Sequence, residues 1–466
     1  MIQKSYMAVV NSSNRQHIQK QNRTAVSMDG STKNDFSSAK KYDSSTTLVA
    51  SPSEEERYKS LVSFPPTDGS YAWMVATGII LGTLLTGLSN CWGIMQDYYL
   101  RNKVFDSPHV ISQLTMVGNL LQMFIYSFVF FGNILCPFVG VKWLLIIGTS
   151  MMSIGLVLSG MATSIWHLYL SLGVCTGIGI SIHFAVALRV MAQWFVKRRN
   201  TACGIQAATV PFTSLILPFM MTPINNNLGP AWTYIILGII FFAIHCSAIL
   251  MVKERLTEQE RDAEKKNVLD FSVLKNTDLV IWLMVGPIQL FAQYLVYTFL
   301  PSYATYLGLS DWQGATIVTI VSLMNCVGRT GGGVVADKIG PLNTFIIAMI
   351  IAMITVWVNW VLAKSFIALI AFAVIFGVVY GCYGPTATGV VLSIIDMKQY
   401  YSATSFRMLV FCTCIFGPMI ATHVESMNHG EPFFYCKIVT GIGYALCALL
   451  SIVLKFRKNR NLFVKI

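Results

Sequence analysis

The chain has 466 residues, of which 55% are hydrophobic and only 12% are charged, and its mean hydropathy is +0.60. Because a soluble globular protein usually has about a quarter of its residues charged, this composition excludes that class and indicates an all-α protein with several membrane spans. The net charge of +12 does not favour a nucleic-acid partner, because the basic residues stand in tails and in loops beside apolar runs, where they set membrane orientation.

The first 67 residues are rich in Ser, Asn, Gln, Thr and Lys and show no sustained hydrophobic period. We expect residues 1–67 to form a disordered tail. The tail has no apolar signal core, so the first membrane span itself is expected to direct insertion.

Apolar runs long enough to cross a bilayer then follow one another, and we count about twelve. They cover residues 72–99, 111–132, 143–162, 165–193, 200–222, 231–252, 279–304, 312–335, 342–362, 366–394, 402–422 and 433–455. The charged stretch 253–277 divides six spans from six. We therefore expect an N-terminal six-helix bundle over 68–252, a cytoplasmic linker over 253–277, a C-terminal bundle over 278–456 and a short cytoplasmic tail over 457–466.

The distribution of basic residues between alternate loops predicts the orientation. One side carries 12 Lys and Arg residues, six of them between Lys253 and Lys275, whereas the other side carries three or four. By the positive-inside rule, both termini should lie in the cytoplasm.

Residues 325–343 hold the most informative pattern in the chain. An arginine near the middle of a membrane helix costs roughly 2.5 to 3.5 kcal/mol on insertion scales, so Arg329 must face a cavity, a partner or the interface. Gly328 and Gly332 lie on one helix face and would let a neighbouring backbone approach closely. Asp337 and Lys338, before a Gly and a Pro, predict a short polar turn. The corresponding turn at 132–140 lacks the acidic and basic pair, and we interpret it as a decayed copy of the same motif.

Three stretches resemble known transporter signatures. Residues 325–343, which contain the pattern GRxxGxxxADxxGPxN, are similar to the loop between helices eight and nine of major facilitator transporters. Residues 68–73, Asp-Gly-Ser-Tyr-Ala-Trp, resemble the first signature of the monocarboxylate porter family, with alanine in place of its last glycine. Residues 194–209 resemble that family's helix-five motif, although Gln206 and Thr209 replace small residues.

The resemblance implies a major facilitator fold with two six-helix halves, which would rock around a site near the membrane midplane. In that fold, helices 1, 4, 7 and 10 line a central cavity, and helices 5, 8 and 11 contribute. Polar and aromatic side chains at those places are Thr86, Ser89, Asn90, Ser181, His183, Gln289, Gln293, Tyr294, Tyr297, Tyr380, Tyr383 and Thr386. Each of them could instead bond a neighbouring helix, since such bonds are worth about 0.6 kcal/mol on average in membranes.

Arginines are the strongest candidates for binding a solute. The planar guanidinium of Arg329 suits a carboxylate or another acceptor-rich ligand. Arg407 and Arg189 lie nearer the interface, where a binding or gating role and snorkelling toward water explain them about equally. The predicted substrate-binding residues are Arg329, Asn325, Asn90, Gln289, Gln293, Tyr297, Tyr383 and Arg407. The predicted gating residues are Asp337, Lys338, Lys197 and Arg198.

Two departures from the family pattern bear on coupling and substrate. The resemblance implies an aspartate and a lysine, associated with proton and carboxylate handling, where this chain has Asn325 and Cys91. Since Asn325 does not titrate, proton coupling through that pair is not available. The residues at 308–314, Gly-Leu-Ser before Gln-Gly, resemble the fungal branch of the family, which includes a riboflavin transporter.

The chain contains no GxxxxGK[ST] phosphate cradle, no Ser-His-acid or HExxH arrangement, and no metal spacing among its histidines. We expect neither an enzyme nor an ATP-driven pump, and no cofactor or metal. The predicted function is secondary transport of a small, monocarboxylate-like organic solute, with riboflavin or another planar nutrient as the alternative. A non-transporting nutrient sensor on the same fold is the second alternative. The expected partners are the solute and the lipid bilayer, in the plasma membrane rather than the vacuolar one, and protein partners stay open.

Overall fold

The computed structural model of the chain describes residues 64–106, 109–266, 269–413 and 433–458. Within these ranges the backbone is almost entirely helical and contains no strand. Most of the predicted N-terminal tail (1–63), residues 414–422 of the predicted eleventh span and most of the C-terminal tail (459–466) lie outside the described residues.

Helices of the first group run from residue 70 to residue 251. They are α3 (Ser70–Thr83), η1 (Leu84–Cys91), α4 (Trp92–Arg101), α5 (Val110–Val139), α6 (Val141–Gly160), α7 (Ile165–Leu168), η2 (Tyr169–Thr176), α8 (Gly177–Trp194), α9 (Arg199–Ala207) and α10 (Thr209–Met251).

A short charged helix and a single turn follow, and they lead into the second group. These elements are α11 (Glu258–Lys266), η3 (Phe271–Lys275), α12 (Thr277–Tyr306), α13 (Asp311–Ile339), α14 (Pro341–Ile354), η4 (Thr355–Trp360), α15 (Phe366–Gly381), α16 (Tyr383–Ile394), α17 (Met397–Phe411) and α19 (Phe434–Lys458).

Ten helical segments among the described residues are long and apolar enough to cross a membrane. One of them, Arg199–Met251, joins two predicted spans and is interrupted at Gly229, whose φ of 85° is not helical. The predicted span 402–422 begins in α17 and continues beyond the described residues. The other predicted spans each coincide with one apolar segment, within a few residues at each end.

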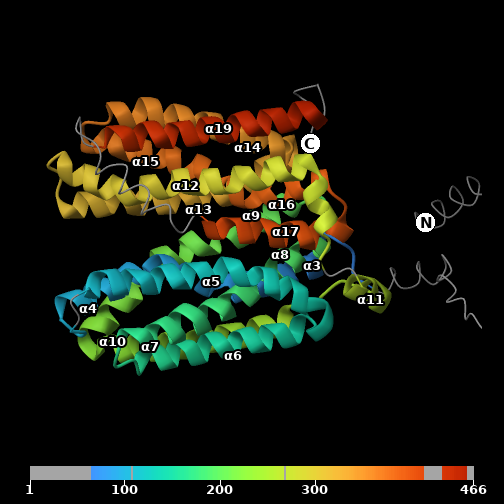
Figure 1. The fold of residues 1–466 in the computed structure, drawn as a ribbon, viewed down its shortest axis with the longest axis horizontal. Helices are drawn as coiled ribbons and strands as arrows, with labels where there is room; N and C mark the ends of the chain where they lie inside the picture. Colours follow the sequence, from blue (N-terminus) through green and yellow to red (C-terminus); the bar gives the residue numbers. More distant parts are fainter. Residues whose placement is uncertain (1–63, 107–108, 267–268, 414–432, 459–466) are drawn as a thin grey trace, which may run out of the picture. The chain divides into compact units, whose positions relative to one another are not determined.

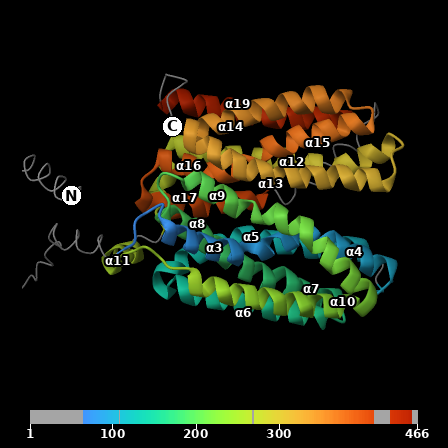
Figure 2. The same cartoon turned by 180° about the vertical axis from the view of Figure 1, so that it is seen from behind.

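The two groups lie side by side, with the first largely below the second in Figure 1 and in the reverse view of Figure 2. The helix α11 lies at one end of both groups, which we call the linker end. The buried core of the second group includes Val129, Ala185, Leu188 and Ala192 of α5 and α8, so the two groups are packed against each other along these helices.

Tight helix–helix contacts explain two of the glycines of α13, Gly328 and Gly332. A Cβ added to Gly328 would lie 2.1 Å from the carbonyl oxygen of Val378, and one on Gly332 would lie 2.8 Å from Sγ of Cys382. The prediction that Gly328 and Gly332 admit a neighbouring backbone is therefore confirmed, and that neighbour is α15 and the residue that follows it.

Both turns of the repeated motif adopt the same conformation. Gly140, between α5 and α6, has a φ of 86°, and Gly340, between α13 and α14, has a φ of 99°. A side chain at either position would be strained, so glycine is required to turn the chain directly from one long helix into the next. The first turn has kept its geometry although it lacks the acidic residue of the second.

Candidate functional site

A cavity of about 510 Å³ lies between the two helix groups and is lined by side chains from both. All eight predicted substrate-binding residues are among those that line it: Asn90, Gln289, Gln293, Tyr297, Asn325, Arg329, Tyr383 and Arg407. No Asp or Glu is present in the lining, whereas two arginines are. The cavity is therefore suited to a solute that carries negative charge or many acceptors, although the role of each residue stays a prediction.

The first membrane segment contributes its lining from an irregular stretch. Between α3 and α4 the backbone tightens into the 3₁₀-helical η1, which carries Thr86, Ser89 and Asn90. Nδ2 of Asn90 donates to Oγ of Ser214 on α10 at 3.1 Å, and that hydroxyl donates to the carbonyl oxygen of Gly87 at 3.1 Å. Short 3₁₀ stretches inside long helices often mark hinges, and no pattern in the sequence predicts this one.

A chain of hydrogen bonds orders one wall of the cavity. Gln293 on α12 donates to the hydroxyl of Tyr380 on α15 at 2.8 Å, and Nδ2 of Asn325 donates to the same oxygen at 2.9 Å. Oδ1 of Asn325 in turn accepts from Nε of Arg329 at 3.0 Å. An amide fits this position because it both donates and accepts, whereas an ionised carboxylate could only accept.

Arg329 also links the two helix groups. Its Nη1 donates to the carbonyl oxygen of Ala207, at the end of α9, at 3.0 Å. The helices meet closely here, because a Cβ on Gly204 would lie 2.3 Å from the carbonyl oxygen of Arg329. Arg329 thus lines the cavity and at the same time forms a contact between the first and second groups.

Three other polar side chains in the lining are buried and hold a nitrogen that has no hydrogen-bond partner among the described residues. They are Arg407 through Nε, Gln289 through Nε2 and Gln206 through Nε2. Their exposed fractions are 3%, 2% and 3%. All three nitrogens are donors, so a bound acceptor would satisfy them.

Gln206 is one of the lining residues that sequence reasoning missed. It stands on α9, where the family's helix-five motif has a small residue, and it lines the cavity. That departure was visible in the sequence, and a polar amide in place of a small residue on a helix expected to line the cavity was the signal.

At the linker end, Asp337 of α13 caps the start of α9 across the boundary between the groups. Its carboxylate accepts from the backbone N–H groups of Asn200 and Thr201 at 3.0 and 2.9 Å, and from their side chains at 2.9 and 2.6 Å. An acidic side chain at a helix N-terminus satisfies free N–H groups and interacts favourably with the helix dipole.

A second carboxylate holds the residues just before α9. Asp68 accepts from the N–H groups of Val196, Lys197 and Arg198 at 3.2, 3.0 and 2.9 Å. Partial burial raises the pKa of Asp68, but these three hydrogen bonds outweigh it and hold the pKa below its usual value. Both ends of this contact belong to the first group.

The three basic residues predicted to gate behave differently from Asp337. Lys197, Arg198 and Lys338 have exposed side chains, and in the described part of the chain these side chains make no hydrogen bond or ion pair. Lys197 and Arg198 contribute through their backbone N–H groups alone. A gating role for these three side chains stays a prediction.

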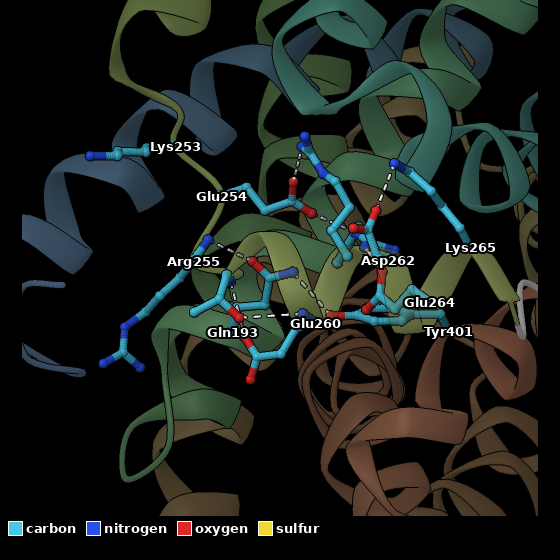
Figure 3. A network of polar contacts seen from close by, with 12 residues as sticks. Gln193, Lys253, Glu254, Arg255, Glu260, Asp262, Glu264, Lys265 and Tyr401 are labelled. Atoms are coloured by element: carbon cyan, nitrogen blue, oxygen red, sulfur yellow. Dashed lines mark hydrogen bonds and ion pairs between the residues drawn. The ribbon is translucent and has the colours of Figure 1, made fainter. Parts of the chain in front are cut away.

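A buried ionic network ties the linker to the same end. Arg189 on α8 is 1% exposed and pairs with Glu254 at 2.9 Å and with Glu264 of α11. Its guanidinium carbon lies 4.1 Å from the ring centre of Tyr401, on α17 of the second group. Figure 3 shows Glu254, Glu264 and Tyr401 in this network, and Gln193 donates to the hydroxyl of Tyr401 at 3.0 Å. Arg189 therefore lies in a buried network that joins both groups and the linker, and snorkelling does not account for it.

Not every predicted lining residue reaches the cavity. Ser181, His183 and Thr386 are buried but are absent from the lining. His183 bonds Thr149 of α6 at 3.2 Å, and its ring centre lies 4.8 Å from that of His245, inside the first group. Thr386 donates to carbonyl oxygens of its own helix region. The expectation was wrong for these three, because helix numbering places a helix but not the rotation of its faces.

A model of the Major Facilitator Superfamily matches residues 76–422. The chain belongs to this superfamily. Curated relatives include the probable transporter MCH2 of Saccharomyces cerevisiae, 25% identical over 405 residues that cover 84% of each chain. Monocarboxylate transporter 4 of Gallus gallus is 25% identical over 395 residues, 82% of each chain. The aspyridones efflux protein apdF of Emericella nidulans is 27% identical over 321 residues, 67% of this chain and 63% of that one.

Solved structures agree on the fold. The proton:xylose symporter XylE, bound to 6-bromo-6-deoxy-D-glucose, superposes with a TM-score of 0.65 at 15% identity, over 84% of this chain and 96% of the other. The transporter FucP in the outward conformation gives 0.62 at 14% identity, over 85% and 99%. The predicted major facilitator fold is confirmed, and the chain is a multi-pass membrane transporter of this superfamily.

Proposed function

We propose that the protein is a secondary transporter that carries a small organic anion, such as a monocarboxylate, by alternating access. The observation that supports this most directly is the cavity of about 510 Å³, which has two arginines and no carboxylate among its described lining residues. In a low-dielectric site, guanidinium groups bind carboxylates through charge-assisted hydrogen bonds and disfavour cations.

The proposed movement is rocking of the two helix groups about the cavity. The contacts that would break when the linker end opens join the two groups: Asp337 with Asn200 and Thr201, and Gln193 with Tyr401. By the positive-inside rule this end faces the cytoplasm, with both termini on that side, and the plasma membrane is the proposed location.

We further propose that the transported solute does not exchange protons with a carboxylate in the cavity. Asn325 stands where the resemblance implies an aspartate, and it is fixed between Tyr380 and Arg329 by hydrogen bonds on both sides. The driving force for an anion would then be its own gradient and the membrane potential, or a second solute.

A planar nutrient such as riboflavin is the second candidate. Aromatic side chains support it: the cavity lining includes Tyr126, Tyr294, Tyr297, Tyr380, Tyr383 and Phe411. Flat rings stack favourably on such side chains, and the buried amides of Gln206 and Gln289 offer hydrogen bonds to a heteroaromatic edge.

The test is uptake of labelled lactate, pyruvate and riboflavin into vesicles that contain the purified protein, with and without a pH gradient. Gln289→Leu removes a cavity donor at nearly constant volume and should raise the KM for the transported solute. Thr386→Val is the matched control, because that hydroxyl is buried outside the cavity and bonds only its own helix region. Absence of uptake for all three solutes would contradict the proposed substrates, and binding of one of them without uptake would favour the non-transporting sensor.

A further inference from the structure

We propose that Arg407, and not Arg329, holds the anionic group of the solute, and that Arg329 is a positioning residue that joins the two helix groups. This inference rests on the proposed function, because it assigns roles within the same cavity. It reverses the expectation from the sequence, in which Arg329 is the principal ligand for the solute.

Two of the five N–H donors of Arg329 are already used within the protein. Its Nε donates to Oδ1 of Asn325, and its Nη1 donates to the carbonyl oxygen of Ala207 on the other helix group. Asn325 is itself fixed by its bond to Tyr380, so the guanidinium is held in one orientation. A carboxylate that bound the edge of Arg329 containing Nε would have to displace Asn325, so only Nη donors remain open to a solute.

Arg407 has the opposite surroundings. It lines the cavity from α17 and is only 3% exposed, yet it forms no hydrogen bond or ion pair with any described residue. The ring centre of Phe411 lies 6.0 Å from the guanidinium carbon of Arg407. A buried guanidinium without an acceptor is costly, and an anionic solute is the acceptor that the cavity can admit.

Charge at the two positions agrees with this assignment. Tyr400 and Cys203, both neutral in their usual state, are among the titratable side chains that interact with Arg407 electrostatically. Arg189, nearer the linker end, is by contrast paired with two glutamates. Arg407 is thus a buried arginine of the cavity whose counter-charge the described chain does not supply.

The first experiment needs no solute. Purified full-length wild type, Arg407→Gln and Arg329→Gln are compared by thermal unfolding, followed by tryptophan fluorescence. Because the substitution at 407 removes an unpaired buried charge, we expect a Tm equal to or above that of wild type. The substitution at 329 breaks two hydrogen bonds and should lower the Tm. A clear loss of stability in Arg407→Gln would show that the protein itself supplies its partner, and would overturn the inference.

The second experiment uses pyruvate, lactate and benzoate, each paired with its neutral amide, as probes of binding by thermal shift. We expect at least one acid, and not its amide, to stabilise wild type. In Arg407→Gln the affinity for that acid should fall by about 10- to 100-fold. Arg407→Lys, which keeps the charge, should retain part of the binding. Arg329→Gln should bind the same acid with little change but transport it at a lower maximal rate.

The outcomes separate the inference from the transporter proposal. Loss of acid binding in Arg329→Gln with retention in Arg407→Gln would overturn the inference, and so would the absence of acid binding in wild type. If riboflavin uptake proceeds while no acid binds, the transporter proposal survives and the inference does not. If acid binding depends on Arg407 but no solute of the panel is taken up, the inference survives and the transporter proposal does not.

Discussion

Replacing Asp337 by Asn should shift the protein toward a state that is open at the linker end. The carboxylate accepts four hydrogen bonds from Asn200 and Thr201, which lie in the other helix group. These bonds must break when the groups separate there. The substitution therefore acts on the difference between two states of the folded protein, and should alter transport without unfolding it.

The size of the effect follows from the bonds that asparagine keeps. One amide oxygen can serve about half of the four donors, and it no longer carries the charge that favours the N-terminus of α9. Charge-assisted hydrogen bonds contribute about 1.5 to 3 kcal/mol each when well buried. Since Asp337 is partly exposed, we expect a loss of about 2 to 3 kcal/mol, which shifts the equilibrium roughly 30- to 150-fold.

Distances between spin labels at positions 197 and 338 would measure that shift, because the lysines at both positions are exposed and belong to different groups. The matched control is Asp68→Asn, which weakens a similar cap of backbone N–H groups, but one whose two ends lie in the same group. The expected result is a larger open population in the Asp337 variant alone. The reasoning is refuted if Asp337→Asn leaves the distances and transport unchanged, or if Asp68→Asn shifts the distances equally.

Three further outcomes are expected. Gly328→Ala should destabilise the fold by about 1 to 3 kcal/mol in thermal unfolding, because its Cβ meets the carbonyl oxygen of Val378, whereas Gly331→Ala, with nothing within 4 Å, should be neutral or stabilising. Burial raises the pKa of Glu264 in the docked state above its usual value of 4.5, despite the nearby Arg189. Docking of α11 should therefore be strongest below pH 4.5 and should weaken as the pH rises through the raised pKa. Hydrogen exchange of α11 measures this, and Glu264→Gln should abolish the pH dependence. Arg189→Gln should leave Glu264 without its partner and Glu254 with Arg261 alone, and so loosen α11 by roughly 3 kcal/mol. Faster hydrogen exchange at neutral pH would show this, whereas unchanged exchange would contradict a role for the ion pairs.

Much of the fold was predictable because a bilayer leaves few solutions. The bilayer core offers no water to the backbone, so a run of about 20 apolar residues that crosses it must be helical. The positions of the spans therefore follow from hydropathy alone. The turn after α13 was equally readable, since Gly340 and Pro341 end one helix and begin the next. The π-helical segments η2 and η4 and the 3₁₀ stretch η1 were not predicted, because their causes lie in packing between helices and leave no period in the sequence.

The site was predictable in membership but not in roles. Polar side chains on lining helices are few, so choosing them recovered Asn90, Gln289 and Gln293 in the cavity. Which arginine is engaged depends on the carbonyl oxygen of Ala207, a backbone atom that every residue carries. No sequence pattern distinguishes an arginine that reaches such an oxygen from one that does not.

The decayed turn at 132–140 shows how the structure changes an interpretation that the sequence favoured. Because this turn has no counterpart of Asp337, the sequence alone suggests that closure of the linker end depends mainly on Asp337 in the second half. The linker instead covers the turn: a Cβ on Gly140 would lie 3.2 Å from Nη2 of Arg261, which pairs with Glu254 at 2.8 Å. Glu254 also pairs with Arg189, so the ionic contacts missing from the first turn are present between α8 and the linker. Closure of this end then depends on two different sets of contacts. One is the carboxylate of Asp337, which caps α9 across the groups, and the other is the linker, which buried ion pairs hold in place. Weakening either set alone should open the end only in part.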